Sequence, residues 1–194
     1  MSNRAVRLLA VMALSGAAAA CSGPERQVVD NYFNAVRAQD NEDNVRAITA
    51  RVHGTFQDQA GGLGVLSADM TVARFEDRNG TVTAIGRIVG ALADSAGTVV
   101  GPVSQELALP VDNVASTCNQ LRMDLAAIDA DVRQTLVHFD GEVAGFDSRD
   151  GTTPRAMGAL CAAESLLRGK NATPDALTRA LNDVLATLAS THGR

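Results

Sequence analysis

Three aspartates, Asp124, Asp129 and Asp131, come nearest to a pattern that could do chemistry in this sequence. They lie in stretches where polar and apolar residues alternate as they do in β-strands. A line of carboxylates on such strands could bind a cation or take part in acid–base catalysis. The same alternation is typical of the solvated face of a half-buried sheet. Because no His or Cys accompanies the three carboxylates as a partner, we favour the solvated face.

The sequence holds three histidines, His53, His138 and His192. A catalytic histidine needs a nucleophile and an orienting acid close by, but the sequence contains no G-x-S-x-G, S-x-x-K or H-E-x-x-H motif. His53 is expected at a helix end and His138 on the solvated side of a strand, while His192 lies close to the C-terminus. We therefore assign no catalytic residue, and a non-catalytic function is the favoured interpretation.

Two further patterns fail as ligand sites. Residues 62–64 read Gly-Leu-Gly but lack the third glycine and the preceding strand of a dinucleotide loop. Residues 40–44 begin like a calcium loop, but the chain lacks that loop's turn glycine and bidentate glutamate. Aromatic residues make up 3% of the chain and its net charge is −5, which argues against nucleic acid as a partner. The sequence thus predicts no cofactor, no metal site and no nucleic-acid partner.

Residues 1–20 have the three regions of an export signal. Arg4 and Arg7 form a positive start, residues 8–14 form an apolar core too short to span a membrane, and residues 17–20 are alanines. Residues 18–21, AAAC, resemble a bacterial lipobox, in which the cysteine is lipidated and becomes the mature N-terminus. This resemblance implies a cell-envelope lipoprotein anchored to the membrane through Cys21, on its periplasmic or extracellular side. The alternative is cleavage by ordinary signal peptidase, which would give a secreted soluble protein.

The chain has three cysteines, Cys21, Cys118 and Cys161. If Cys21 carries lipid, an even pair remains in an oxidising compartment, so a disulfide between Cys118 and Cys161 is expected. Closing a loop of this size stabilises a fold by about 4 kcal/mol in the chain-entropy model. The alternative is two free buried thiols. A metal site lacks the C-x-x-C or H-x-x-x-H spacing that would support it.

The first part of the mature chain predicts an amphipathic helix over residues 22–37. Ser22 caps it, with Glu25 three residues on. Val28, Tyr32 and Val36 then recur at helical spacing, so one face of the helix is apolar and the other polar. Such a helix needs a surface to cover its apolar face.

A second short helix is expected to carry Val45, Ile48 and Val52. The glycine-rich segment 59–64 then marks the junction with a β-rich part. The sequence thus divides into a signal peptide (1–20), a lipid-anchor and helical segment (21–60), and a β-rich domain with C-terminal helices (61–190).

Alternating apolar residues and turn signals predict a mostly antiparallel β-region. The expected strands are residues 71–77, 81–92, 99–103, 106–111, 121–125, 128–132, 135–139 and 142–146. Asn79-Gly80 and Asp140-Gly141 separate consecutive strands and predict two tight hairpins, and residues 94–97 predict another turn.

Two helices close the chain. Residues 154–168 predict the first helix, and Thr173 with Pro174 starts the second, whose apolar stripe runs from Leu177 to Leu188. The fold class is therefore α+β, with an N-terminal helical segment, a mostly antiparallel β-region and two C-terminal helices packed on the sheet.

Three segments form a pattern shared with other proteins. They are the hairpin GALADSAGTVVG, the alternating stretch CNQLRMDLAAIDADV followed by LVHFDGEVAGF, and the helices GALCAAESLL and ALTRALNDVLATL. Together, over about residues 82–188, they resemble a family of uncharacterised exported bacterial proteins. The resemblance implies paired cysteines, here Cys118 and Cys161, and an exported location. It implies no activity, so no catalytic residue is carried over.

Three functions remain open. We favour an exported envelope protein that is non-catalytic and acts through contacts with an envelope protein partner. The second is a binding or carrier module for a small apolar ligand between sheet and helices, which a hollow on the order of a few hundred Å³ would support. The third is an enzyme with an unrecognised site, which needs polar groups of perturbed pKa in a cleft.

Overall fold

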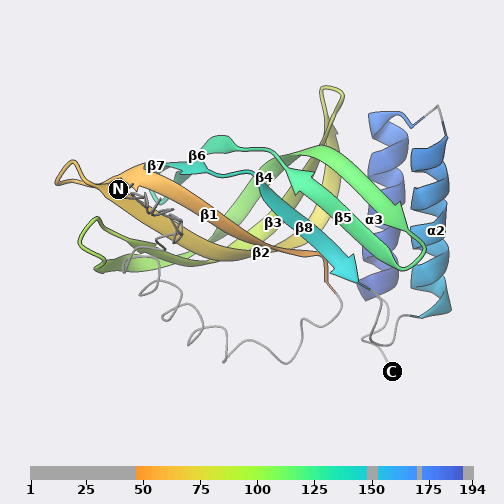
Figure 1. The fold of residues 1–194 in the computed structure, drawn as a ribbon, viewed down its shortest axis with the longest axis horizontal. Helices are drawn as coiled ribbons and strands as arrows, with labels where there is room; N and C mark the ends of the chain where they lie inside the picture. The colour runs from red at the N-terminus through yellow and green to blue at the C-terminus, as the bar shows by residue number, and fades with distance from the viewer. Residues whose placement is uncertain (1–46, 148–152, 170–171, 190–194) are drawn as a thin grey trace, which may run out of the picture.

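The computed structural model describes residues 47–147, 153–169 and 172–189; the signal peptide, Cys21 and the expected helix over 22–37 lie outside them. The strands are β1 (Thr49–Gln57), β2 (Leu63–Arg78), β3 (Thr81–Ala93), β4 (Val99–Thr117), β5 (Gln120–Leu125), β6 (Ile128–Val132), β7 (Thr135–Phe139) and β8 (Glu142–Asp147). The helices are α2 (Pro154–Arg168) and α3 (Pro174–Ala189). This part of the chain is mostly antiparallel sheet with two C-terminal helices, in agreement with the expected class (Figure 1).

The antiparallel sheet closes on itself. Its hydrogen-bonded order runs β2-β3-β4-β5-β8-β1, and β1 pairs again with β2 along its whole length. Closure gives hydrogen-bond partners to strand edges that an open sheet would offer to other chains. β6 and β7 extend the ring, because they pair with each other and β7 also pairs with β1.

The prediction of a hairpin at Asp140-Gly141 is wrong. β7 and β8 follow one another along the same edge of β1, where Gly54 pairs with Phe139 and Ala50 with Ala144. Four steps on β1 (54 to 50) face five steps on β7 and β8 (139 to 144), so one extra residue bulges there. The backbone N–H of Asp140 donates to the carbonyl oxygen of His53 at 3.1 Å, which holds the bulge against β1. The register of β1 therefore overrides the local turn signal.

The prediction of a second helix around Val45, Ile48 and Val52 is also wrong, because Ile48 directly precedes strand β1 and Val52 lies within it, while Val45 lies outside the described residues. Alternate residues from Ile48 to Phe56 are buried. This alternation has the period of a strand and places the apolar side chains in the closed interior. The glycine-rich segment is the turn between β1 and β2, so the boundary expected at 60/61 falls inside a hairpin.

The other turns follow their sequence signals more closely. Asn79 and Gly80 have φ angles of 56° and 82° and join β2 to β3 as a tight hairpin, as predicted. Gly97 has a φ of 79° in the expected turn between β3 and β4. The two short strands expected at 99–103 and 106–111 are parts of the single long strand β4.

Aliphatic side chains fill the interior of the closed sheet. The largest fully buried side chains of this core are Phe139, Ile48, Leu66, Met70, Ile88, Leu109, Leu121, Met123, Leu160 and Leu181. Glycines of β3 let β2 approach closely, since a Cβ at Gly90 would collide with the carbonyl oxygen of Ser67. The small residues that alternate along β3 in the sequence thus allow tight strand packing.

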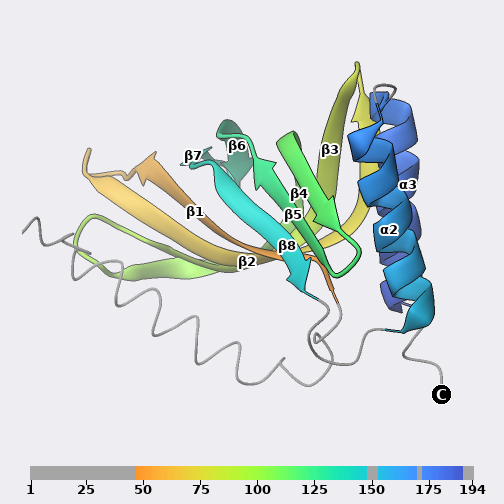
Figure 2. The ribbon, with the colours of Figure 1, turned by 45° about the vertical axis from the view of Figure 1, so that its right-hand side comes forward.

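Both helices lie side by side across one end of the sheet, as Figures 1 and 2 show. The hydroxyl oxygens of Thr153 and Thr173 cap them by accepting hydrogen bonds from Ala156 and Ala176, at 3.3 and 3.2 Å. The apolar stripe of α3 is buried at Leu181, Val184 and Leu188. The helices therefore cover the end of the interior where the β2–β3 and β4–β5 turns lie.

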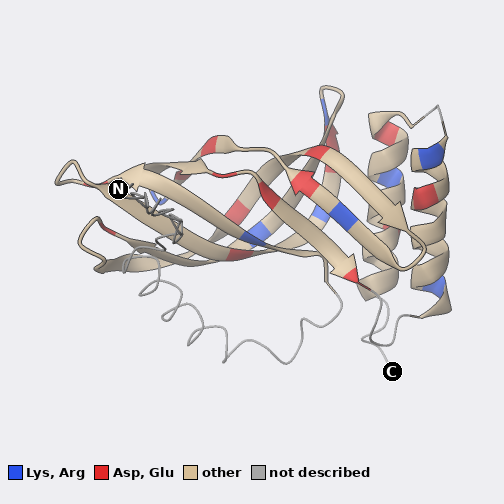
Figure 3. Cartoon of the chain, in the orientation of Figure 1, with Lys and Arg blue, Asp and Glu red and all other residues tan. Residues whose placement is uncertain are grey.

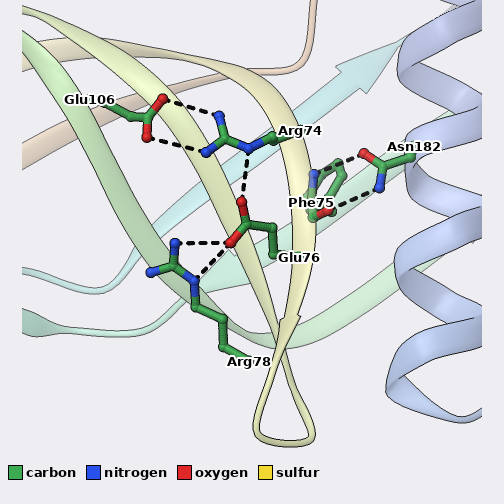
Figure 4. A network of polar contacts seen from close by, with 6 residues as sticks. All are labelled: Arg74, Phe75, Glu76, Arg78, Glu106 and Asn182. Atoms are coloured by element: carbon green, nitrogen blue, oxygen red, sulfur yellow. Dashed lines mark hydrogen bonds and ion pairs between the residues drawn. The ribbon is translucent and has the colours of Figure 1, made fainter.

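A charged network crosses the outer face of the sheet near the helices (Figure 4). Arg74 on β2 donates to both carboxylate oxygens of Glu106 on β4, at 3.0 and 3.3 Å, and to Glu76 at 2.8 Å. Ile85 of β3 pairs with Arg74 in the ladder and is fully buried although it points away from the interior. The bridge from Arg74 to Glu106 spans β3 and accounts for this burial.

Candidate functional site

The end of the sheet opposite the helices is formed by the turns 58–62, 94–98 and 133–134, and we call it the open end (Figure 1). Asp58 ties two of these turns together. One of its carboxylate oxygens accepts from the N–H groups of Ala60 and Gly62, at 2.9 and 2.8 Å. The other accepts from the hydroxyl and N–H of Ser95, at 2.6 and 3.0 Å.

These hydrogen bonds change the acidity of Asp58. The side-chain bond from Ser95, followed by the backbone bonds, lowers the pKa of Asp58 from 3.8 to about 2, because donors favour the charged carboxylate. Asp58 therefore stays ionised at ordinary pH and acts as a clamp between turns.

A surface pocket of about 620 Å³ lies at the open end. It is lined by the end of β1 and the following turn, the start of β2, and residues of β6 and β7. Its polar side includes Asp129 and His138, and its apolar side includes Leu63 and Leu136. The pocket is therefore an amphipathic depression at the surface rather than a hollow in the buried interior.

Asp129 and His138 form a hydrogen-bonded pair on this pocket. They face each other across the β6–β7 ladder, and 2.7 Å separates the Nδ1 atom of His138 from a carboxylate oxygen of Asp129. Their side chains are 56% and 63% exposed. The prediction that Asp129 has no histidine partner is thus wrong. So exposed a pair remains solvated, and it has the geometry of a surface polar contact rather than of a general base held by a buried acid.

Three of the exposed large apolar side chains lie at strand ends near the open end, and we call them the open-end patch. Leu63, Val100 and Leu136 are 63%, 60% and 67% exposed. Leu63 begins β2, Leu136 follows the β6–β7 turn, and Val100 is the extra residue where β4 bulges against β3. Arg133 links the last two regions, because it donates to the carbonyl oxygen of Pro102 at 2.8 Å.

The three candidate aspartates have separate partners. Asp124 contacts Arg122 at 3.4 Å and accepts from Asn113 at 3.1 Å. Asp131 accepts from the backbone N–H of Gln134 at 2.9 Å and so shapes the β6–β7 turn. No group of three or more His, Cys, Asp or Glu side chains among the described residues could hold a metal ion. Local ion pairs and turn contacts thus account for the three carboxylates.

The remaining candidates lie elsewhere. His53 on β1 contacts Glu142 on β8 at 2.7 Å, beside the bulge at Asp140, and both side chains are about one-fifth exposed. His192 and Cys21 lie outside the described residues. Cys118 and Cys161 form the expected disulfide, which joins the β4–β5 turn to α2 at the helix end of the sheet.

Sequence reasoning missed the open-end patch. The available signal was the position of two of its members, with Leu63 between glycines and Leu136 in a short strand after a polar pair. An apolar residue at a strand end is ambiguous, because neighbouring strands decide whether it is covered.

In the part of the chain that the structure describes, neither helix has the length and apolar character needed to cross a bilayer. Comparison with known proteins gave no matching family model, no matching curated protein and no matching solved structure.

Proposed function

We propose that this chain is an exported, non-catalytic cell-envelope protein that binds an envelope protein partner through its open end. The observation that carries the proposal is the open-end patch. Single exposed apolar residues are ordinary on a protein surface, but a group of them with a polar surround is typical of an interaction site. Leu63, Val100 and Leu136 lie at strand ends near the open end, and the helices cover the other end of the sheet (Figure 1).

The surround of the patch suits a protein partner. The pocket that Leu63 and Leu136 line also includes Asp58, Asp129 and His138, which supply hydrogen-bonding groups beside these two apolar side chains. Protein interfaces commonly combine an apolar centre with such a polar rim. In the view of Figure 3, acidic and basic residues are interspersed over the strands, which favours a protein over a polyanion such as nucleic acid.

The continuous buried core favours this proposal over a carrier of a small apolar ligand. Such a carrier needs a hollow between sheet and helices. Here Leu160 of α2, Leu181 of α3 and Met123 of β5 are fully buried in one continuous core. Catalysis has less support, because the acid and histidine at the open end are both more than half exposed.

Export and anchoring belong to the same proposal. The signal-like residues 1–20 and the lipobox-like residues before Cys21 support a lipid anchor on the outer side of a membrane. The disulfide between Cys118 and Cys161 is the kind of bond that persists in an oxidising compartment. The resemblance to exported bacterial proteins over about 82–188 points the same way.

The partner is tested by placing a photo-crosslinking amino acid at Leu136 in the native host. We expect one discrete adduct, which disappears when Leu63→Ser and Val100→Ser are introduced. The matched control places the crosslinker at Met157, which is 37% exposed on α2 and should not give that adduct. Equal adducts from both positions, or an adduct that survives the two serine substitutions, would refute the role of the patch.

Native mass spectrometry and cell fractionation test the rest of the proposal. Native mass spectrometry of the mature Cys21→Ser protein should show the bare chain, whereas an extra mass lost on denaturation would identify a ligand carrier instead. Fractionation of cells should place the lipid-modified wild-type protein in the membrane and release the Cys21→Ser variant. A wild-type protein that is soluble and begins at an unmodified Cys21 or a later residue would contradict the anchor.

A further inference from the structure

Three small side chains are buried on the outer face of the closed sheet. Ser67 is 1% exposed, and Ala91 and Ala93 are 0% exposed. They alternate along β2 and β3 with residues such as Leu66 and Leu92, which belong to the core. By the two-residue period of a strand, the three therefore point away from the interior.

The three residues form one continuous strip. Ser67 pairs with Ala91 across β2 and β3. Val65 and Val99 flank Ala93 on its two sides, and both pack against the alanines in a cluster separate from the core. We call these five residues the outer strip.

Neighbouring strands do not hide the outer strip. Ala91 lies between Ser67 and Pro102, whose short side chains cannot reach over it, and Pro102 is itself exposed. Both described helices lie across the other end of the sheet (Figures 1 and 2). A further element is therefore needed to account for the burial of the outer strip.

We propose that the amphipathic helix predicted over residues 22–37 packs along the outer strip with Val28, Tyr32 and Val36 facing it. This segment has the apolar stripe that such a contact needs. The alanines and the serine leave room for larger side chains of a helix, because small residues allow a close approach. The two surfaces are complementary in size, with large apolar side chains on one and small ones on the other.

Chain length permits this packing. The outer strip lies about six residues along the strands from the start of β1, a distance of roughly 20 Å at strand rise. A helix of about 16 residues is ~24 Å long, and the roughly ten residues that follow it can span up to ~35 Å. Since β1 is the strand next to β2, the chain enters the sheet beside the strip. Under the anchoring proposed above, the helix would also fix how the sheet lies relative to Cys21.

The rate at which maleimide labels a single introduced cysteine tests the proposal. In the full mature chain with Cys21→Ser, the variants Ala91→Cys and Val100→Cys each provide one free thiol beside the native disulfide. We expect maleimide to label Cys at position 100 at least tenfold faster than at position 91. Combining Ala91→Cys with Val28→Asp, Tyr32→Asp and Val36→Asp should raise its labelling toward the rate at position 100, while Asn34→Asp on the polar face should leave it slow.

The outcomes separate the proposal from its competitors. Fast labelling at position 91 in the parent chain, or continued protection in the triple-aspartate variant, would overturn it. Protection that falls on dilution as a dimer dissociates would instead assign the cover to a second copy. If the triple variant does not fold, benzoylphenylalanine in place of Tyr32 gives the answer, because crosslinks must then map within the same chain to residues 63–69 or 89–101.

Discussion

Asn182 on α3 holds Phe75 on β2 by both polar groups of the Phe75 backbone. The amide oxygen of Asn182 accepts from the N–H of Phe75 at 2.8 Å, and its amide nitrogen donates to the Phe75 carbonyl oxygen at 2.9 Å (Figure 4). The pairing of β1 with β2 runs only as far as Thr71. Asn182 therefore takes the place of a neighbouring strand and joins the helices to the sheet.

Replacing Asn182 with Ala should lower the free energy of unfolding by about 2 kcal/mol, because two partly buried backbone groups lose their partners. Urea unfolding measures this loss. Asp183→Ala, at the exposed next position of α3, should stay within about 0.5 kcal/mol of the parent. Equal effects of the two substitutions would show that the contact with Phe75 contributes nothing.

The disulfide should contribute a comparable or larger amount. Cys118 and Cys161 are 43 residues apart, and a loop of this size corresponds to about 4 kcal/mol in the chain-entropy model. The double variant Cys118→Ser/Cys161→Ser should therefore unfold at much lower denaturant concentration. A reductant should destabilise the parent and leave the double variant unchanged. A parent that is insensitive to complete reduction would contradict this stabilisation.

Local turn chemistry explains where the fold could be predicted and where it could not. Asn79-Gly80 forms the expected hairpin because both residues adopt a positive φ at little cost. Arg133 and Gln134 also adopt positive φ and make the real turn between β6 and β7, although neither residue favours it. Closure of the sheet requires a reversal there, and this requirement comes from contacts distant in sequence.

Prediction of the candidate site from the sequence met the same limit, because it also depends on contacts distant in sequence. Asp129 and His138 are nine residues apart, and only a turn at 133–134 places them opposite each other. With the turn expected at Asp140-Gly141, His138 had no acidic partner to predict. The disulfide needed no such register, because the parity of the cysteines and the expected compartment sufficed. Contacts that depend on local pattern were thus predictable, and those that depend on strand register were not.

Arg74 should control the acidity of Glu106. The side-chain hydrogen bond from Arg74 is the main cause that holds the pKa of Glu106 below its ordinary value. Arg74→Gln should therefore raise the pKa of Glu106, which an NMR titration of the side-chain carboxyl measures. Arg87→Gln is the matched control, because Arg87 donates instead to Ser104. If the pKa of Glu106 is the same in the parent and in Arg74→Gln, then Arg74 does not cause the lowered pKa.

The clamp formed by Asp58 should make the open end sensitive to acid. Its pKa of about 2 in the folded protein lies below the value of about 3.9 expected in the unfolded chain. A lowered folded pKa means that the stabilisation is fully present above about pH 4 and is lost as the pH falls through 2. The stability difference between the parent and Asp58→Asn should therefore shrink as the pH falls from 5 to 2.

Ser95 provides the independent check on this pH dependence. Because its hydroxyl makes the main contribution to the lowered pKa, Ser95→Ala should raise the pKa of Asp58 and move the loss of stability to higher pH. Ser104→Ala, which removes a surface hydroxyl that accepts from Arg87, should keep the parental profile. Unfolding curves recorded at intervals from pH 5 to pH 2 compare the three proteins. A Ser95→Ala profile that superimposes on the parent would mean that the turns are held together by contacts other than the clamp.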